Sequence, residues 1–170
     1  MPLYPRPKHQ RIIEPFAGSA GYAHCYPMLK VHLWDLDPVI CALWEYLINV
    51  SEDEILGLPD IEERQRVDSL NLAIEAQYLI GFWLNKATTK PAKTPGAWCR
   101  SGIRGDSVWG PQIRSRIAGQ LHAIRHWTIS HGSYQAIDNV DACWFVDPPY
   151  VDKGRYYSCS SKGIDFQALG

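Results

Sequence analysis

The chain has 170 residues, of which 46% are hydrophobic and 21% charged, and its formal net charge is −1. This length fits one domain with a substantial core, and the near-neutral charge by itself points to no class of partner. The five cysteines are scattered and include no Cys-x-x-Cys pair, which argues against a disulfide framework or a zinc site and favours a reducing, cytoplasmic compartment. No stretch is long and apolar enough for a signal peptide or a membrane span, so no membrane association is expected.

A strand and a tight turn are predicted near the start, after a proline-rich, basic arm over residues 1–10. The strand covers residues 11–16 and the turn covers residues 17–21 (Ala-Gly-Ser-Ala-Gly), with a helix beginning near Ala20. Small residues after a strand let the backbone turn sharply and approach a ligand. Such a turn on its own is more often only a turn, so a ligand site here depends on the elements that follow.

A second strand, over residues 31–35, ends in two acidic residues, Asp35 and Asp37. Asp37 precedes Pro38 and is expected to cap a helix over residues 39–49. Asp35 is the better candidate for a ligand because it ends a strand and follows Gly18 by 17 residues. In nucleotide-binding α/β folds, an acidic residue near that spacing binds ribose hydroxyl groups.

The middle of the chain divides by charge. Residues 35–75 carry eleven acidic side chains against two arginines, whereas residues 86–126 carry eight basic side chains against Asp106 alone. A capping box at residues 51–54 predicts a short helix. A longer helix is predicted over residues 60–85, and its buried face is expected to comprise Leu70, Ile74, Tyr78 and Leu79.

Residues 87–111 are rich in Thr, Pro and Gly and predict an exposed, irregular, basic loop that carries Trp98 and Trp109. Cations suit phosphate groups and aromatic rings suit bases, so this loop is a candidate nucleic-acid-binding surface. The alternative is a solvated face that is basic without a partner. A helix is predicted next, with inward-facing residues Ile113, Ile117, Leu121 and Ile124 and mostly outward-facing arginines 114, 116 and 125.

Two further strands are predicted, over residues 127–130 and 142–146. The second consists of five apolar residues and is expected to be buried and parallel. It ends at Asp147-Pro148-Pro149-Tyr150, where two prolines without N–H groups stop both helix and ladder.

The Asp-Pro-Pro-Tyr loop offers chemistry suited to a planar heterocycle with an amino group. Asp147 and the carbonyl of Pro148 can each accept a hydrogen bond, and Tyr150 can stack on a ring. The alternative is a tight turn that ends a core strand.

With Glu14-Pro15-Phe16-Ala17-Gly18-Ser19, Asp35 and the Asp-Pro-Pro-Tyr loop in that order, the chain resembles the Dam-like adenine-specific DNA methyltransferases, especially the small phage or prophage members. The resemblance is strong over residues 11–45 and 129–150, weaker over residues 80–110 and poor elsewhere. It implies a Rossmann-like class I methyltransferase domain over residues 1–170, with residues 86–126 as a target-recognition insert. It also implies S-adenosylmethionine as cofactor, double-stranded DNA as partner, and action in a bacterial cytoplasm, with neither a metal nor an obligate protein partner.

The resemblance assigns roles residue by residue. The residues that would hold and activate the target adenine are Asp147, Pro148, Pro149 and Tyr150. The residues that would bind the cofactor are Pro15, Phe16, Ala17, Gly18, Ser19, Asp35, Leu36, Ser133, Tyr134 and Asp147. The residues that would bind DNA are Lys86, Lys90, Lys93, Arg100 and Arg104.

Three features depart from the family pattern. Ala20 stands where the family has its second motif glycine, which predicts a different loop geometry. Ser133 stands where the family often has Asp, which predicts a weaker hydrogen bond to the cofactor base. The chain ends 20 residues after Tyr150, whereas family members continue through further strands, so the sheet is expected to be incomplete at its C-terminal end. Two alternatives therefore stay open: transfer to an RNA adenine or a cytosine amino group, and an inactive remnant that binds cofactor or DNA.

Overall fold

The computed structural model describes residues 4–85, 88–100, 107–149, 164–165 and 167. The chain divides into two compact units, one of residues 1–48 with 123–170 and the other of residues 49–122. We call the first the sheet unit and the second the helical unit. Among the described residues, no helix combines the length and the apolar character needed to cross a membrane.

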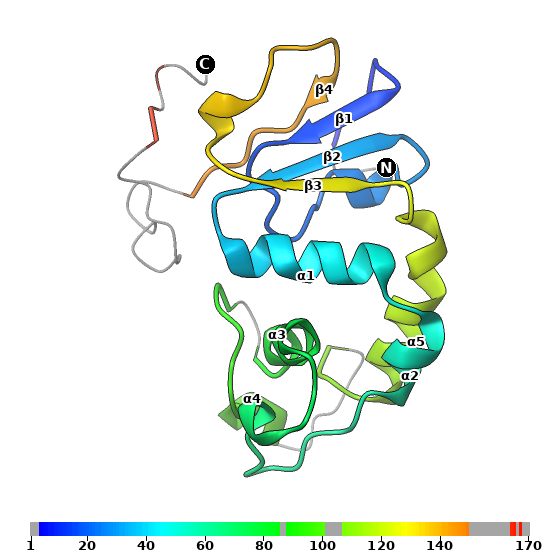
Figure 1. Cartoon of the computed structure of the whole chain (residues 1–170), viewed down its shortest axis with the longest axis vertical. Helices are drawn as coiled ribbons and strands as arrows, with labels where there is room; N and C mark the ends of the chain where they lie inside the picture. Colours follow the sequence, from blue (N-terminus) through cyan, green and yellow to red (C-terminus); the bar gives the residue numbers. More distant parts are fainter. Residues whose placement is uncertain (1–3, 86–87, 101–106, 150–163, 166, 168–170) are drawn as a thin grey trace. The chain divides into compact units, whose positions relative to one another are not determined.

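Within its described residues, the sheet unit contains four strands, all paired in parallel, in the order β3-β2-β1-β4. The strands are β1 (Arg11–Glu14), β2 (Lys30–Asp35), β3 (Thr128–His131) and β4 (Cys143–Trp144). Figure 1 shows β1, β2 and β3 pointing the same way, so their carboxyl ends share one edge of the sheet. The expectation of an α/β protein with a parallel sheet is confirmed.

Apolar residues of β1, β2 and α1 form the core of the sheet unit. Ile12, Val31 and Leu33 are at most 3% exposed. Helix α1 (Pro38–Asn49) runs beside the sheet (Figure 1) and buries Cys41, Leu43, Trp44 and Ile48. Strand β1 is buried continuously from Ile12 to Glu14, as is typical of parallel strands covered on both faces, whereas burial alternates along β2.

The start of α1 agrees with the predicted cap. Asp37 Oδ1 accepts the N–H of Val39 at 2.9 Å, and Pro38 is the first helical residue. A proline suits this position because its missing N–H would have no partner there.

The helix predicted near Ala20 is wrong. Ala20 has φ +51°, a left-handed conformation that cannot continue into a right-handed helix. Its N–H donates to the Ala17 carbonyl at 2.6 Å, and the first helical turn is η1 (Ala23–Cys25). The segment between β1 and β2 is therefore mostly turns.

The last strand is shorter and more exposed than predicted for residues 142–146. Only Cys143 and Trp144 pair with β1, both half-buried, and Val146 is 38% exposed. The N–H of Phe145 still reaches the Ile13 carbonyl at 2.9 Å. The next β1 donor toward this strand would be residue 15, and Pro15 has no N–H, so the ladder stops there.

The helical unit is built from short helices. They are α2 (Glu52–Gly57), η2 (Val67–Ser69), α3 (Ile74–Trp83), α4 (Ala97–Arg100), α5 (Pro111–Gln120) and η3 (Leu121–Ala123), which crosses the unit boundary. Ser51 Oγ accepts the N–H of Glu54 at 3.1 Å, which confirms the predicted cap of α2. Helices α2 and α5 pack together, and Ile55 and Ile113 are almost fully buried.

The long helix predicted over residues 60–85 is wrong in its first half. The N–H of Val67 donates to the Lys93 carbonyl at 2.9 Å, so it cannot make the bond that a continuous helix needs. Helix α3 begins only at Ile74, which is 48% exposed although it was predicted on the buried face. The residues that α3 buries are Ala76, Leu79, Ile80 and Gly81.

Candidate functional site

The carboxyl edge of the sheet contains a point where the strand order reverses. From β1 the chain moves to β2 and β3 on one side, and β4 then pairs on the other side of β1. In open parallel sheets, ligands bind in the crevice outside the carboxyl ends at such a reversal. Asp35 ends β2, and the segments that follow β1, β3 and β4 contain Phe16, Tyr134 and Asp147, so all four lie in the neighbourhood where a ligand is expected.

Asp35 holds the turn after β1 in place. Its Oδ2 accepts the N–H of Gly18 at 3.0 Å, and its Oδ1 accepts the N–H of Asp37 at 2.8 Å. Burial raises the pKa of Asp35, and these two N–H groups only partly oppose that rise. Each carboxylate oxygen has a second acceptor site, so the group can still bind hydroxyl donors from a ligand.

The turn itself leaves space beside its backbone. Gly18 has φ +45°, and a Cβ added there would meet no atom within 4 Å. Its carbonyl is fixed by the Nε1–H of Trp44 at 2.9 Å, while the Ala17 N–H binds the Trp34 carbonyl at 2.9 Å. The backbone is thus rigidly held next to an open surface, which suits close approach of a ligand.

A different turn geometry was expected at Ala20, because the resemblance would place a glycine there. The alanine instead adopts the left-handed conformation that glycine favours, and it is fully buried. An alanine at this position is therefore compatible with a positive φ in the turn.

Two of the predicted cofactor residues meet through their rings. The ring centroids of Phe16 and Tyr134 lie 5.3 Å apart at an interplanar angle of 38°. Both side chains are half-buried. They come from the segments after β1 and β3, so the fold unites parts of the chain that are more than a hundred residues apart.

The other predicted cofactor residues differ in their surroundings. Ser133 Oγ accepts the N–H of Gln135 at 3.3 Å as the cap of η4 (Tyr134–Ala136), so its hydroxyl already has a structural role. Leu36 is 52% exposed, Ser19 is exposed, and Pro15 is buried.

Glu14 is a residue of this edge that the sequence reasoning did not assign to the site. It ends β1, its side chain is 1% exposed, and its Oε1 accepts the N–H of Ala23 at 2.6 Å. Burial raises its pKa to about 7; backbone N–H groups of Ala23 and Tyr22 act in the opposite direction, and the charge of Asp147 adds to the rise. A glutamate at an inward position of an Ile-Ile-Glu strand was the available sequence signal.

The Asp-Pro-Pro-Tyr loop follows β4, next to the end of β1. Asp147 is exposed, Pro148 and Pro149 are half-buried, and Tyr150 lies outside the described residues. Because Asp147 raises the pKa of Glu14, the two carboxyl groups interact electrostatically. Glu14 and Asp147 therefore influence each other at this edge, and Asp35 ends the neighbouring strand β2.

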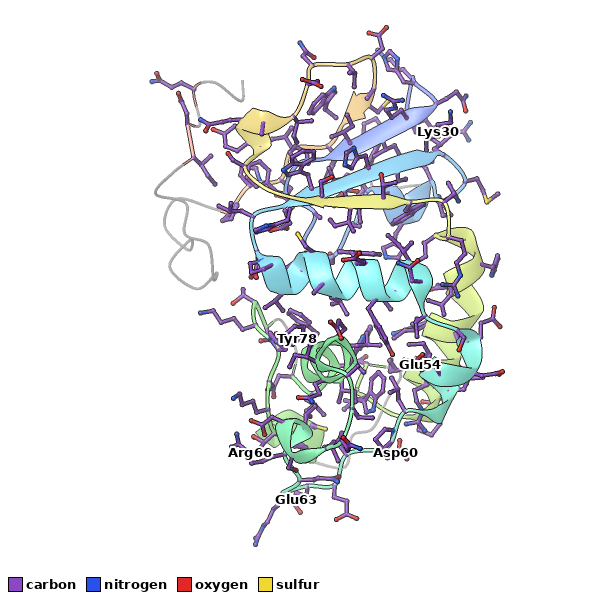
Figure 2. All side chains as sticks on the ribbon, in the orientation of Figure 1. Lys30, Glu54, Asp60, Glu63, Arg66 and Tyr78 are labelled. Atoms are coloured by element: carbon purple, nitrogen blue, oxygen red, sulfur yellow. The ribbon has the colours of Figure 1, made fainter. Side chains whose placement is uncertain are left out.

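The basic segment is less exposed than predicted. It contains helix α4, and Pro95, Val108 and Trp109 are buried, with Trp109 Nε1 donating to the Pro59 carbonyl at 2.8 Å. Arg114 was expected to face outward, yet its side chain is 11% exposed and pairs with Asp60 at 2.5 Å (Asp60 is labelled in Figure 2). Much of this segment consequently has a structural role.

The predicted DNA-binding residues are only partly described. Lys90 is exposed. Lys93 forms an ion pair with Asp68 at 3.1 Å, and Asp68 also pairs with Arg66 at 2.6 Å (Figure 2 labels Arg66). These two cations lower the pKa of Asp68 to about 2. Lys86, Arg104 and the side chain of Arg100 lie outside the described part of the chain.

The helical unit contains a surface hollow of about 600 Å³. It is lined by Glu62, Glu63, Arg64 and Gln65, none of which was predicted to bind a ligand. Within the described ranges, no group of three or more His, Cys, Asp or Glu side chains could hold a metal ion.

No protein-family model matches this chain, and no curated protein matches it.

Proposed function

We propose that this protein transfers the methyl group of S-adenosylmethionine to the exocyclic amino group of adenine in DNA. The observation that carries the proposal is the link from Asp35 to the Gly18 N–H, at the edge where the strand order reverses. Nucleotide-type sites likewise combine a glycine turn after the first strand with an acidic residue farther along the chain that binds the ribose, which supports the proposal. The order β3-β2-β1-β4 also agrees with the first four strands of the doubly wound fold.

The residues at this edge fit the cofactor in three respects. The remaining acceptor sites of Asp35 suit ribose hydroxyl groups. The Phe16 and Tyr134 rings offer an apolar, aromatic surface for an adenine ring. The open side of Gly18 leaves room for the cofactor beside the backbone. When bound, S-adenosylmethionine supplies a methyl group on a cationic sulfur.

Asp147 and Pro148 would act on the acceptor. The adenine amino nitrogen is a poor nucleophile because its lone pair is conjugated with the ring. Hydrogen bonds from its two N–H groups to the Asp147 carboxylate and the Pro148 carbonyl would increase the electron density on nitrogen and favour a tetrahedral geometry. Positioning the nitrogen in line with the methyl group then supplies most of the acceleration.

Double-stranded DNA is the proposed partner. The target adenine cannot react while it is stacked inside the DNA duplex. The target base must be flipped out, and stacking on Tyr150 would hold it. The basic segment over residues 86–126 would bind phosphate groups, and the proposed methyltransferase domain would extend over residues 1–170.

Cofactor binding is tested with Asp35→Asn. We expect the binding free energy for S-adenosylmethionine to weaken by about 1–3 kcal/mol, because asparagine offers the ribose hydroxyl groups one acceptor oxygen instead of two. Isothermal titration calorimetry measures the change. Asp141→Asn is the matched control, since Asp141 is exposed in the same unit. Equal affinities for the parent and the Asp35 variant would remove Asp35 from the site.

Catalysis is tested with Asp147→Ala in a methyl-transfer assay that uses labelled S-adenosylmethionine with DNA, RNA or no nucleic acid. We expect transfer to DNA to fall at least about a hundredfold, equivalent to about 3 kcal/mol of transition-state stabilisation. Cofactor binding without transfer by the parent would instead favour the inactive remnant, and transfer to RNA alone would change the substrate class.

A further inference from the structure

Glu14 is an ionisable group in the core at the point where β1 and β4 diverge. By register it lies beside Leu33 of β2, and the N–H of Phe145, just after β4, donates to the carbonyl of the preceding Ile13. Its carboxyl group binds the Ala23 N–H at 2.6 Å, which links the end of β1 to η1. The residues between Glu14 and Ala23 include Phe16, Gly18 and the rest of the proposed cofactor turn.

The neighbours of Glu14 give its carboxylate little support. The titratable groups that face it are Asp147, in the segment after β4, and the Tyr22 phenol, just before η1. Within the part of the chain that the structure describes, no lysine or arginine forms an ion pair with Glu14. A second carboxylate and desolvation both oppose its ionisation, and only backbone N–H groups favour it.

A ligand with positive charge at this edge would supply the counter-charge that Glu14 lacks. We propose that Glu14 is a positioning residue that couples the binding of a cationic methyl donor to the loss of its own proton, so that donor and proton compete. This inference rests on the proposed function, because S-adenosylmethionine carries a sulfonium charge. The product, S-adenosylhomocysteine, has the same nucleoside, amino and carboxyl groups but a neutral sulfur.

Loss of the proton would also affect the turn. An ionised carboxylate accepts a stronger hydrogen bond than a neutral carboxyl group, so the bond to the Ala23 N–H would strengthen when the donor binds. The turn of residues 15–23 would then be held more firmly around the charged donor than around the neutral product. The site would thereby distinguish the two ligands by charge as well as by shape.

The test is calorimetry of the full chain at several pH values between 6 and 8, in buffers with different ionisation enthalpies. We expect S-adenosylmethionine binding near pH 7 to release a fraction of a proton, and its affinity to rise with pH. The rise approaches about tenfold for each unit by which the donor lowers the pKa of Glu14. Binding of S-adenosylhomocysteine should release measurably fewer protons. Because the two ligands share their amino and carboxyl groups, any protons that these groups exchange cancel when the ligands are compared.

Glu14→Gln is the decisive variant because glutamine keeps an oxygen for the Ala23 N–H but has no proton to lose. We expect this variant to bind S-adenosylmethionine with little dependence on pH and without the proton release of the parent, while Asp141→Asn behaves like the parent. If the parent binds the donor without proton release, or if Glu14→Gln releases as much, the inference is overturned. If no form binds the donor at any pH, the proposed function itself fails.

A spectroscopic measurement covers the case in which Glu14→Gln folds poorly. In the parent labelled with ¹³C-glutamate, the Glu14 side-chain carbon should titrate near neutral pH in the free protein. Saturating S-adenosylmethionine should move that titration to lower pH and S-adenosylhomocysteine should move it less. Identical titrations in all three states would contradict the coupling.

Discussion

Ala20 shows that a residue with a side chain can hold a backbone conformation that usually belongs to glycine. An L-residue in the left-handed region costs about 1–2 kcal/mol relative to its preferred conformations, and Ala20 pays this cost at φ +51°. Its methyl group is fully buried, so packing contributes in the opposite direction. The turn is held by neighbouring contacts, including the Asp35–Gly18 hydrogen bond.

Replacement of Ala20 by glycine is expected to change the free energy of unfolding by less than about 1 kcal/mol, because relief of strain and loss of the buried methyl group nearly cancel. Urea denaturation measures this change. Ala118→Gly is the matched control, because Ala118 is buried inside helix α5, and it should destabilise by about 1–2 kcal/mol. Equal losses at both positions would show that Ala20 is not strained.

Glu14 should make the stability of the free protein depend on pH. Its pKa rises from 4.5 in the unfolded chain to about 7 in the folded state, so between these values the folded state binds more protons. Glu14 therefore contributes up to about 3 kcal/mol to the free energy of unfolding. This contribution is fully present below pH 4.5 and is lost as the pH rises through 7.

The pH prediction is checked by urea denaturation of the parent and Glu14→Gln at pH 4.5, 6 and 8. The parent should lose more stability than the variant over this range, and the difference isolates Glu14 from Asp35, whose raised pKa acts in the same direction. Parallel pH profiles for the two proteins would mean that Glu14 ionises normally.

At the scale of elements, the cap of α2 is the simplest to test. Ser51→Ala removes the acceptor of the Glu54 N–H and should destabilise the protein by about 1 kcal/mol in denaturant or thermal unfolding. Ser115→Ala is the control, because Ser115 is exposed inside α5 and alanine is a better helix former. A control as destabilised as Ser51→Ala would show that the cap contributes little.

The basic segment leads to a prediction about DNA. Lys90 is exposed, whereas Lys93 is already paired with Asp68. If Lys90 contacts a phosphate group, Lys90→Gln should reduce the log–log slope of affinity against salt by about 0.9. Lys93→Gln should change it less. Fluorescence anisotropy with a labelled duplex measures both slopes, and a slope unchanged by Lys90→Gln would remove this residue from the interface.

The elements also show what local sequence can and cannot predict. The cap at Asp37 and the strand that ends at Asp35 follow from neighbouring residues, and both were predicted. The end of β4 depends on Pro15, which directly follows β1, and the absence of a helix before Ile74 depends on the Lys93 carbonyl. Such long-range partners leave no local signal, so these bounds could not be derived from the sequence.

At the scale of the whole molecule, the parallel sheet and the placement of several site residues at one edge could be predicted. Alternating strands and helices imply parallel pairing, and parallel strands share a carboxyl edge. The strand order and the Phe16–Tyr134 contact required the structure, because neither is encoded at a fixed spacing. The Ile-Ile-Glu pattern of β1 indicates that Glu14 points inward, but its hydrogen bond to the Ala23 N–H depends on the turn that follows and required the structure.

The discontinuity of the sheet unit has a consequence for synthesis on the ribosome. His32 of β2 and Ser130 of β3 are hydrogen-bonded at 2.9 Å, yet they are 98 positions apart. At about 5–20 residues per second, the residues of the helical unit alone take about 4–15 s to make. Until then the backbone of β2 lacks its β3 partner and presents an unpaired edge, which is prone to wrong pairing. The nascent chain therefore passes through an interval in which occupation of that edge by a chaperone would raise the yield of correctly folded protein.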